Sequence, residues 1–329
     1  MGRVPEQEAV PVGLLGAGYM GRNHARVLAS MPGVRLVGVF DEAYEEVGEY
    51  CRRQDLEFFR DPDALMESCR AVVVALPTAL HFDFASRAMR AGLDVLVEKP
   101  IASSVEEGRG LATLAREAGH VLQVGHVERF NPVCLELPRL VDDPIYISCE
   151  RLSPFIPTWV GKTGVTLDLM IHDLDLVLSL VGDEVASVQA VARSVESESE
   201  DIASALVRFE GGTLAGFTAS RVSQAKVRTL SVTQPDLFIA ADLLRQTISL
   251  HHLISNDFVY DERMGYKQVS VTEIPYLSRY GEPLRLELES FIESVRDRSE
   301  PAVTADDGVR ALELAGRVME AAGVPGVPA

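Results

Sequence analysis

The amino-acid sequence predicts an α/β protein with two domains. Strand-like and helix-like segments alternate between residues 10 and 125, a glycine-rich turn joins the first strand to the first helix, and most segments after residue 144 have the pattern of consecutive strands. Alternation indicates a doubly wound parallel sheet, whereas consecutive strands indicate antiparallel pairing. We therefore expect a doubly wound domain in residues 1–125, followed in residues 126–303 by an α+β domain with a large, mostly antiparallel, open-faced sheet.

Short apolar segments of the N-terminal part predict the strands of the parallel sheet. They are residues 10–15, 34–40, 71–76, 93–97 and 120–124. They lack strict alternation of polar and apolar residues, as expected when helices cover both faces of a sheet. Two of the intervening helices have clear start signals, because Asp61 precedes Pro62 and Ser104 precedes an acidic first turn.

The turn after the first strand has the pattern G-x-G-x-x-G, formed by Gly16, Gly18 and Gly21 with Tyr19 and Met20 inside it. Gly16 can adopt the backbone angles of a tight turn, Gly18 leaves room for a pyrophosphate, and Gly21 lets the helix approach the strand. The free amides at the helix N-terminus would then face the phosphates. A glycine-rich loop can also serve only to turn the chain, but the flanking strand and helix favour a dinucleotide site.

Asp41 follows the second predicted strand, 34–40. A carboxylate at this position can accept hydrogen bonds from the hydroxyl groups of an adenosine ribose. It would repel the 2′-phosphate of NADP, so the sequence predicts NAD as the cofactor.

Lys99 lies in the sequence Glu98-Lys99-Pro100, directly after the fifth predicted strand. Ligands of doubly wound sheets collect at the carboxyl ends of the strands, so this lysine can reach a substrate. A charged tripeptide of this kind is more often a solvated surface turn.

The C-terminal part contains one strongly apolar helix and a series of strands. A strand is predicted at 144–153 and a helix at 165–181, and Gly211-Gly212 marks a hairpin turn. The further strands are predicted at 185–195, 202–209, 213–222, 226–233, 237–240 and 246–250. Alternating side chains leave one face of this sheet open, and such a face often meets a second subunit. Two helices, 283–298 and 304–321, end the chain, the last with Thr304 as its N-cap.

Asp168 and His172 interrupt the apolar helix 165–181. They are four residues apart and so lie on one face of a helix. A single histidine among leucines is more often a satisfied core residue, but an aspartate and a histidine together need partners, which a cleft provides.

Composition excludes several classes of function. The 329 residues carry a formal charge of −18, with 31 basic and 49 acidic residues, which opposes binding to nucleic acid. No apolar run approaches the roughly 20 residues of a membrane span, and the acidic N-terminus is unlike a signal peptide. The four cysteines lack metal-binding spacing, so we expect reduced thiols, no bound metal and a cytoplasmic protein.

These motifs together resemble the Gfo/Idh/MocA family of NAD(P)-dependent sugar oxidoreductases. The similar segments are the glycine motif, Leu76-Pro77-Thr78 with His81, Glu98-Lys99-Pro100, Asp168-x-x-x-His172-Asp173 and Thr304-Ala305-Asp306-Asp307-Gly308. The resemblance spans nearly the whole chain. It implies a Rossmann domain, an α+β domain whose open sheet forms homodimers or homotetramers, and a last helix, 304–321, that packs back on the Rossmann domain.

The resemblance also implies roles for individual residues. Lys99, Asp168 and His172 correspond to the catalytic residues of the family. Leu76, Pro77, Thr78, His81, Glu98 and Lys99 would join the glycine motif and Asp41 in binding the cofactor. A nucleotide-sugar substrate would need cations for its diphosphate, for which Arg129 and Lys162 are candidates together with Arg151, Arg193 and Arg221.

Residues 124–132 are most similar to the branch of the family that contains UDP-N-acetylglucosamine 3-dehydrogenase. We therefore expect an NAD-dependent enzyme that oxidises a secondary hydroxyl of a sugar, specifically the 3-hydroxyl of UDP-N-acetylglucosamine. Two alternatives stay open: an inositol or other sugar dehydrogenase or reductase of the same family, and a catalytically silent NAD-binding regulator.

Overall fold

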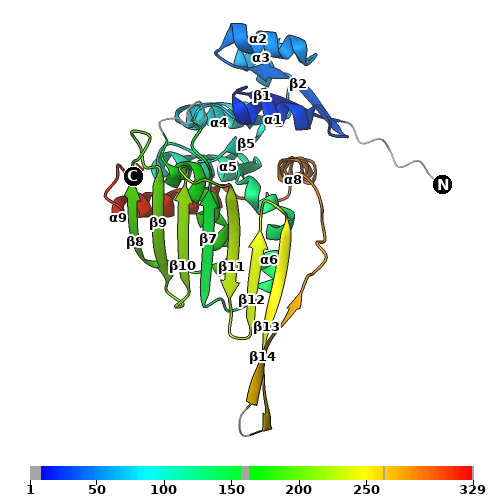
Figure 1. The fold of residues 1–329 in the computed structure, drawn as a ribbon. Helices are drawn as coiled ribbons and strands as arrows, with labels where there is room; N and C mark the ends of the chain where they lie inside the picture. Colours follow the sequence, from blue (N-terminus) through cyan, green and yellow to red (C-terminus); the bar gives the residue numbers. More distant parts are fainter. Residues whose placement is uncertain (1–8, 157–162, 262–263, 328–329) are drawn as a thin grey trace, which may run out of the picture. The chain divides into compact units, whose positions relative to one another are not determined.

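The computed structural model describes residues 9–156, 163–261 and 264–327, with the backbone alone for 253–261 and 264–270 (Figure 1). Backbone contacts divide the chain into two compact units. The first contains the residues up to Val127 and Glu282–Leu312, and the second contains Glu128–Gly281 and Glu313–Gly326. Each unit is built around its own sheet.

The first unit contains a parallel sheet with the strand order β3-β2-β1-β4-β5-β6. This is the order of dinucleotide-binding domains, so the predicted doubly wound fold is confirmed. The strands are β1 (Val10–Leu15), β2 (Val34–Phe40), β3 (Phe58–Phe59), β4 (Ala71–Val74), β5 (Asp94–Glu98) and β6 (Leu122–Gly125). Of these, the sequence analysis missed β3, which is too short for a hydrophobic pattern.

The helices of the parallel sheet begin where the sequence places their caps. Asp61 accepts a hydrogen bond from the amide of Asp63, and Ser104 accepts one from the amide of Glu107. These side chains satisfy amides that the first helical turn leaves unpaired. The helices are α1 (Tyr19–Leu28), α2 (Tyr44–Arg53), α3 (Pro62–Met66), α4 (His81–Arg90) and α5 (Val105–Ala118).

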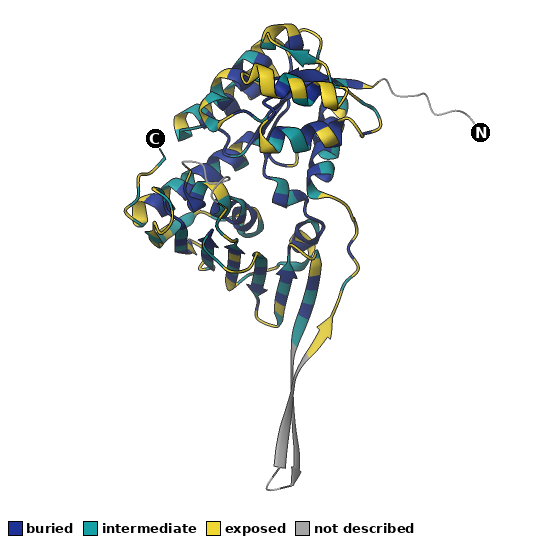
Figure 2. Ribbon diagram, turned by 45° about the horizontal axis from the view of Figure 1, so that its top comes forward, coloured by how far each residue is buried: buried dark blue, intermediate teal, exposed yellow. Residues whose placement is uncertain are grey.

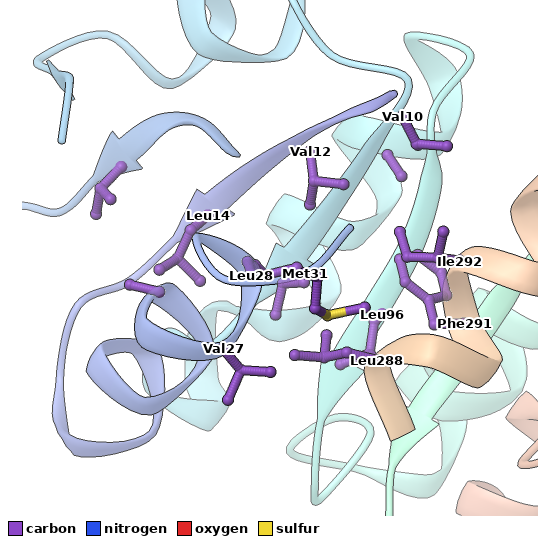
Figure 3. Packing of buried hydrophobic residues seen from close by; sticks show 14 of the residues in the cluster. Val10, Val12, Leu14, Val27, Leu28, Met31, Leu96, Leu288, Phe291 and Ile292 are labelled. Atoms are coloured by element: carbon purple, nitrogen blue, oxygen red, sulfur yellow. The ribbon is translucent and has the colours of Figure 1, made fainter. Parts of the chain in front are cut away.

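Helix α8 (Pro283–Asp297) also belongs to the first unit. Leu288, Phe291 and Ile292 of this helix pack in one hydrophobic cluster with Val12 and Leu96 of the parallel sheet (Figure 3). The boundary predicted from sequence placed these residues in the second domain. The difference arises because the apolar stripe of a helix does not reveal which sheet it covers.

The last helix, α9 (Ala305–Ala321), starts at a capping box. The Thr304 hydroxyl accepts a hydrogen bond from the Asp307 amide at 3.1 Å, and Asp307 accepts one from the Thr304 amide at 2.9 Å. Near this end, a Cβ on Gly308 would lie 2.7 Å from the side chain of Val124 in β6. The N-terminal part of α9 therefore packs closely against the parallel sheet.

The second unit contains an eight-stranded sheet with the order β14-β13-β12-β11-β7-β10-β9-β8. Neighbouring strands are antiparallel except for β7 and β10, so the predicted mostly antiparallel sheet is confirmed. Helix α7 (Ile171–Val181) packs on β7 and β10, and it also contacts α6 (Pro132–Leu140). The strands are β7 (Tyr146–Leu152), β8 (Val185–Arg193), β9 (Ile202–Phe209), β10 (Leu214–Ser220), β11 (Val227–Thr233) and β12 (Leu237–Asp242).

The sheet ends in a hairpin that is longer than predicted. The strand expected at 246–250 is part of β13 (Thr247–Asp261), which pairs with β14 (Met264–Glu273) (Figure 1). Polar residues such as His251, His252 and Asn256 interrupt the apolar alternation there, so the sequence pattern stops before the strand does.

One face of the second sheet is more exposed than the other. Buried and exposed residues alternate along β9 and β10, as the strands of Figure 2 show. Val191, Leu206 and Phe238 are apolar residues with 70%, 43% and 38% of their surface exposed. No described helix has the length and hydropathy needed to span a membrane.

Candidate functional site

The glycine turn of the first unit has the geometry of a phosphate-binding loop. Gly16 has a φ of +99°, and a Cβ there would lie 2.5 Å from the carbonyl oxygen of Ala75. A Cβ on Gly21 would lie 2.0 Å from the carbonyl oxygen of Gly16, so α1 can approach the turn only with glycine there. Gly18 is the N-cap of α1, provides no side-chain cap, and has open space where its Cβ would be. The open space beside Gly18, at the N-terminus of α1, fits a pyrophosphate.

Asp41 follows β2 and is tied to the same loop. One carboxylate oxygen accepts the amide hydrogen of Ala17 at 2.7 Å, and the other accepts that of Ala43 at 2.9 Å. A carboxylate has about four acceptor positions, so both oxygens can still accept ribose hydroxyl groups. Tyr19 and Met20 begin α1 beside this loop, with Tyr19 exposed and Met20 half-buried.

The segment Leu76-Pro77-Thr78 follows β4 and is connected to the end of β5 through His81. The His81 ring nitrogens lie 2.8 Å from the carbonyl oxygens of Leu76 and Pro100. Burial lowers the pKa of His81 below its usual value, although both carbonyl contacts oppose this shift. His81 is therefore a buried link between two loops at the carboxyl edge of the sheet.

Glu98 and Lys99 end β5 at the same edge. Burial alone would raise the pKa of Glu98, but the hydrogen bond and charge of His24 outweigh it, and the pKa lies below its usual value. The His24 Nε2 lies 2.7 Å from one Glu98 oxygen, and the Lys99 amide donates to the other at 3.2 Å. The Lys99 side chain is half-buried, and the Lys99–Pro100 peptide bond is cis.

In the second unit, the predicted helix 165–181 is confirmed, but its first turn is unusual. Thr166–Met170 form a π-helical turn, and α7 follows directly from Ile171. Asp168 lies in the π turn with an exposed side chain, and His172, in the first turn of α7, is half-buried. Single π turns inside helices are frequent at functional sites.

A buried ion-pair network holds the start of α7. Arg151 of β7 donates to both oxygens of Asp173, at 2.6 and 3.0 Å, and to Glu128 at 2.9 Å. Arg228 of β11 donates to the same Glu128 oxygen at 2.9 Å. Because Asp173 directly follows His172, this network fixes the backbone that carries the imidazole.

Burial and the arginine charges have opposite effects on the two acids of this network. Burial alone would raise the pKa of Glu128, but the charges of Arg151 and Arg228 lower it below its usual value. Burial raises the pKa of Asp173, and the charge and hydrogen bonds of Arg151 oppose that shift. The bidentate contact with Arg151 is a geometry that requires a carboxylate.

Three of the arginines proposed for a diphosphate, Arg129, Arg151 and Arg221, donate to carboxylates of the second unit. Arg151 belongs to the network above, and Arg221 donates to the buried Asp201 at 2.7 Å. Arg129 donates to the buried Asp175 at 2.9 Å with about a fifth of its side chain exposed, and Arg193 is exposed on β8. Lys162 lies outside the described residues.

The structure groups the sequence-predicted residues in two places. The glycine motif, Asp41, Leu76–Thr78, His81, Glu98 and Lys99 gather at the carboxyl edge of the first sheet. Asp168 and His172 lie at the start of α7, and Arg129 lies in the segment before α6.

The sequence analysis missed the partners that hold these residues, above all His24, Glu128 and Arg228. An acid inside the apolar helix 165–181 was a signal that a partner existed. The sequence held no information on which distant strand would supply it.

Comparisons with known proteins agree on one family. Residues 10–126 match the NAD-binding Rossmann-fold model of the GFO_IDH_MocA oxidoreductase family, and residues 154–325 match the model of its C-terminal alpha/beta domain. The chain is 36% identical over 241 residues to UDP-N-acetylglucosamine 3-dehydrogenase of Acidithiobacillus ferrooxidans, covering 73% of this chain and 76% of that protein. It is 28% identical to scyllo-inositol 2-dehydrogenase (NAD(+)) of Bacillus subtilis over 330 residues, which cover 94% of this chain and 92% of that protein.

Solved structures give the same result. A structure of the Acidithiobacillus ferrooxidans UDP-N-acetylglucosamine 3-dehydrogenase superposes with a TM-score of 0.85 at 32% identity, covering 95% of this chain and 97% of that chain. A structure described as a putative myo-inositol dehydrogenase from Sinorhizobium meliloti superposes with a TM-score of 0.78 at 25% identity, covering 96% of this chain and 98% of that chain.

Proposed function

Because the chain belongs to the GFO_IDH_MocA family and is an NAD-binding dehydrogenase, we propose that it oxidises the 3-hydroxyl of UDP-N-acetylglucosamine. The observation that carries this proposal is an exposed acid and a half-buried imidazole, Asp168 and His172, held at the start of α7 by a buried ion-pair network. The identity to the Acidithiobacillus ferrooxidans enzyme supports the choice of substrate.

The first unit would hold NAD at the edge of its sheet. Amides of the glycine turn would bind the pyrophosphate, and Asp41 would accept hydroxyl groups of the adenosine ribose. The residues proposed to bind the cofactor are Gly16, Gly18, Tyr19, Met20, Gly21, Asp41, Leu76, Pro77, Thr78, His81, Glu98 and Lys99. Within this group His81 would act by joining two of the loops, since its ring is buried.

The reaction needs an acceptor for a proton and one for a hydride. Bound NAD supplies a nicotinamide carbon that accepts the hydride. His172 would take the hydroxyl proton, because an imidazole titrates near neutral pH. Lys99 would donate a hydrogen bond to the same oxygen and stabilise its developing negative charge. Asp168 would orient the sugar or the imidazole, and Arg129 and Lys162 would contribute positive charge to substrate binding.

Two measurements test this function. NADH formation should appear with UDP-N-acetylglucosamine and not with UDP-glucose, inositol or free hexoses. Lys99→Ala and His172→Ala should each lower kcat by about a hundredfold or more, the effect typical of acid–base groups. The Kd for NAD should stay nearly unchanged in His172→Ala. His251→Ala is a matched control, since this half-buried histidine lies on β13 beside Ser249. Wild-type turnover in the His172 variant would exclude that residue from the mechanism.

Inositol or another free polyol is the second candidate substrate. The Bacillus subtilis scyllo-inositol 2-dehydrogenase is similar over nearly the whole chain, and an inositol 2-dehydrogenase of Rhizobium meliloti is also 28% identical over 323 residues. NADH formation with inositol alone would favour this candidate. Tight NAD binding without turnover of any alcohol would instead indicate a regulator.

We also propose that the exposed face of the second sheet forms a homodimer or homotetramer. The apolar side chains of Val191, Leu206 and Phe238 lie on this sheet with much of their surface exposed. Leu206→Glu should lower the molar mass measured by light scattering, while Arg90→Glu at the exposed end of α4 in the first unit provides a control away from this sheet. A monomeric wild-type protein would contradict the proposal.

A further inference from the structure

Three ionisable side chains from different elements meet inside the first unit: His24 of α1, Glu98 at the end of β5 and Glu287 of α8. One nitrogen or oxygen atom of each lies within 4.8 Å of those of the other two. His24 and Glu287 have no exposed surface, and Glu98 is 6% exposed. The cluster therefore has almost no access to water.

The hydrogen bonds within this cluster are unevenly distributed. His24 Nε2 contacts one Glu98 oxygen at 2.7 Å, and the Lys99 amide donates to the other at 3.2 Å. Both Glu287 oxygens and His24 Nδ1 are buried without a hydrogen-bond partner. Gln123 Nε2 contacts only the backbone carbonyl of Glu287, at 3.3 Å. An acid side chain with both oxygens buried and unpartnered needs a physical explanation.

The charges around Glu287 determine its protonation state. Glu98 is negative and is stabilised by His24, with Lys99 and His81 also near it. A second carboxylate within 4.8 Å of this charge would be desolvated and repelled, with no donor to offset either cost. Burial and the Glu98 charge accordingly raise the pKa of Glu287 well above its usual value.

We propose that Glu287 is a positioning residue that stays a neutral carboxylic acid, so that Glu98 keeps its contacts with His24 and with the backbone of Lys99. This inference rests on the proposed function, since it assigns a purpose to the placement of Lys99. Glu98 can hold the Lys99 amide only while its carboxylate stays between that amide and His24. An ionised Glu287 would push Glu98 away from this position.

The free energy of unfolding should depend on pH, because the folded protein retains the Glu287 proton. The unfolded chain releases the Glu287 proton above about pH 4.3, whereas the folded protein keeps it to a higher pH. The folded state thus binds more protons over this interval, and its free energy of unfolding falls as the pH rises. The ionisable groups that meet Glu287 are His24 of α1 and Glu98 at the end of β5, and Lys99 and His81 act on the charge of Glu98.

Glu287→Gln tests the proposal, because an amide has the shape of the neutral acid and cannot ionise. Relative to wild type, its Tm should be higher by about 2–4 °C at about pH 8.5, with the difference shrinking toward about pH 5. Any alkaline decline of kcat seen in wild type should move to higher pH in this variant. Glu287→Leu, which also carries no charge, should show the same shift of the alkaline decline. Glu289→Gln is the control, since Glu289 lies on the same helix and accepts from Arg285 at 3.0 Å.

Three results would overturn the proposal. One is a Tm difference between Glu287→Gln and wild type that does not change with pH. Another is an altered Tm with a pH profile of kcat like that of wild type, which would make Glu287 a purely structural residue. The third is a stoichiometric divalent metal ion in purified wild type that Glu287→Gln lacks. Tm and metal content need no substrate, so a wrong assignment of the reaction would be distinguishable from a wrong role for Glu287.

Discussion

The two units of this protein position their functional residues by different physical means. In the first unit, glycines and backbone amides shape the phosphate-binding loop, and a Cβ at Gly16 or Gly21 would collide with backbone atoms. In the second unit, the start of α7 is held by buried charges, above all the contact between Arg151 and Asp173. A site shaped by glycines is visible in the sequence as a short local motif, whereas an ion-pair network joins residues that are far apart in the chain.

The largest effect is expected from breaking the network of the second unit. Arg151→Met should lower the free energy of unfolding by about 3–5 kcal/mol, because Glu128 and Asp173 lose a buried partner. Chemical denaturation measures this loss. Arg193→Met on the exposed β8 should change stability by no more than about 0.5 kcal/mol. Equal stabilities of the two variants would show that the network does not hold α7.

The next effect concerns the backbone of the first unit. Gly16→Ala should lower stability by about 1–3 kcal/mol, because alanine is strained at a φ of +99°. It should also weaken NAD binding, measured by calorimetric titration. Gly92→Ala is the matched control, since Gly92 has a φ of +89° but no neighbour within 4 Å of an added Cβ. An unchanged Kd for NAD in Gly16→Ala would rule out this loop as the phosphate site.

A smaller effect is expected at Asp41. Asp41→Asn keeps an acceptor for the Ala17 amide and removes the charge that would repel a 2′-phosphate. The ratio of kcat/KM for NADP to that for NAD should rise by about fivefold, or about 1 kcal/mol. Asp83→Asn, an exposed position on α4, should leave the ratio unchanged. A wild-type preference for NADP would contradict the assigned role of Asp41.

The smallest effect is expected at Thr304, the N-cap of α9. It tests whether a side-chain cap in the first unit stabilises the fold without contributing to NAD binding. Thr304→Ala removes the acceptor for the Asp307 amide and should cost about 1 kcal/mol of stability. The Kd for NAD should not change. Thr304→Ser is the control because it keeps the hydroxyl, and a loss of stability in both variants would contradict a capping role.

Sequence patterns predicted the first unit more completely than the second. The strands β1, β2, β4, β5 and β6, the glycine turn and the caps at Asp61 and Ser104 all have local patterns, and the structure confirms these elements. The short β3 and the polar parts of β13 and β14 have no such pattern. The placement of α8 depends on which sheet receives its apolar stripe.

The candidate site shows the same contrast. Gly16, Lys99, Asp168 and His172 belong to short motifs that suggest chemistry without a structure. The partners of these residues do not, since the pairing of Arg151 with Asp173 depends on the folding of β7 against α7. A charged residue in an apolar segment predicts that a partner exists but not its identity.

The transfer of deuterium from substrate to cofactor tests the central claim most directly. The protein is incubated with NAD and UDP-N-acetylglucosamine labelled with deuterium at C3, and the reduced cofactor is analysed by mass spectrometry. We expect NADH that carries the deuterium, together with a slower turnover than with unlabelled substrate. Reduced cofactor without the label, or no reduction while inositol is oxidised, would contradict the assignment.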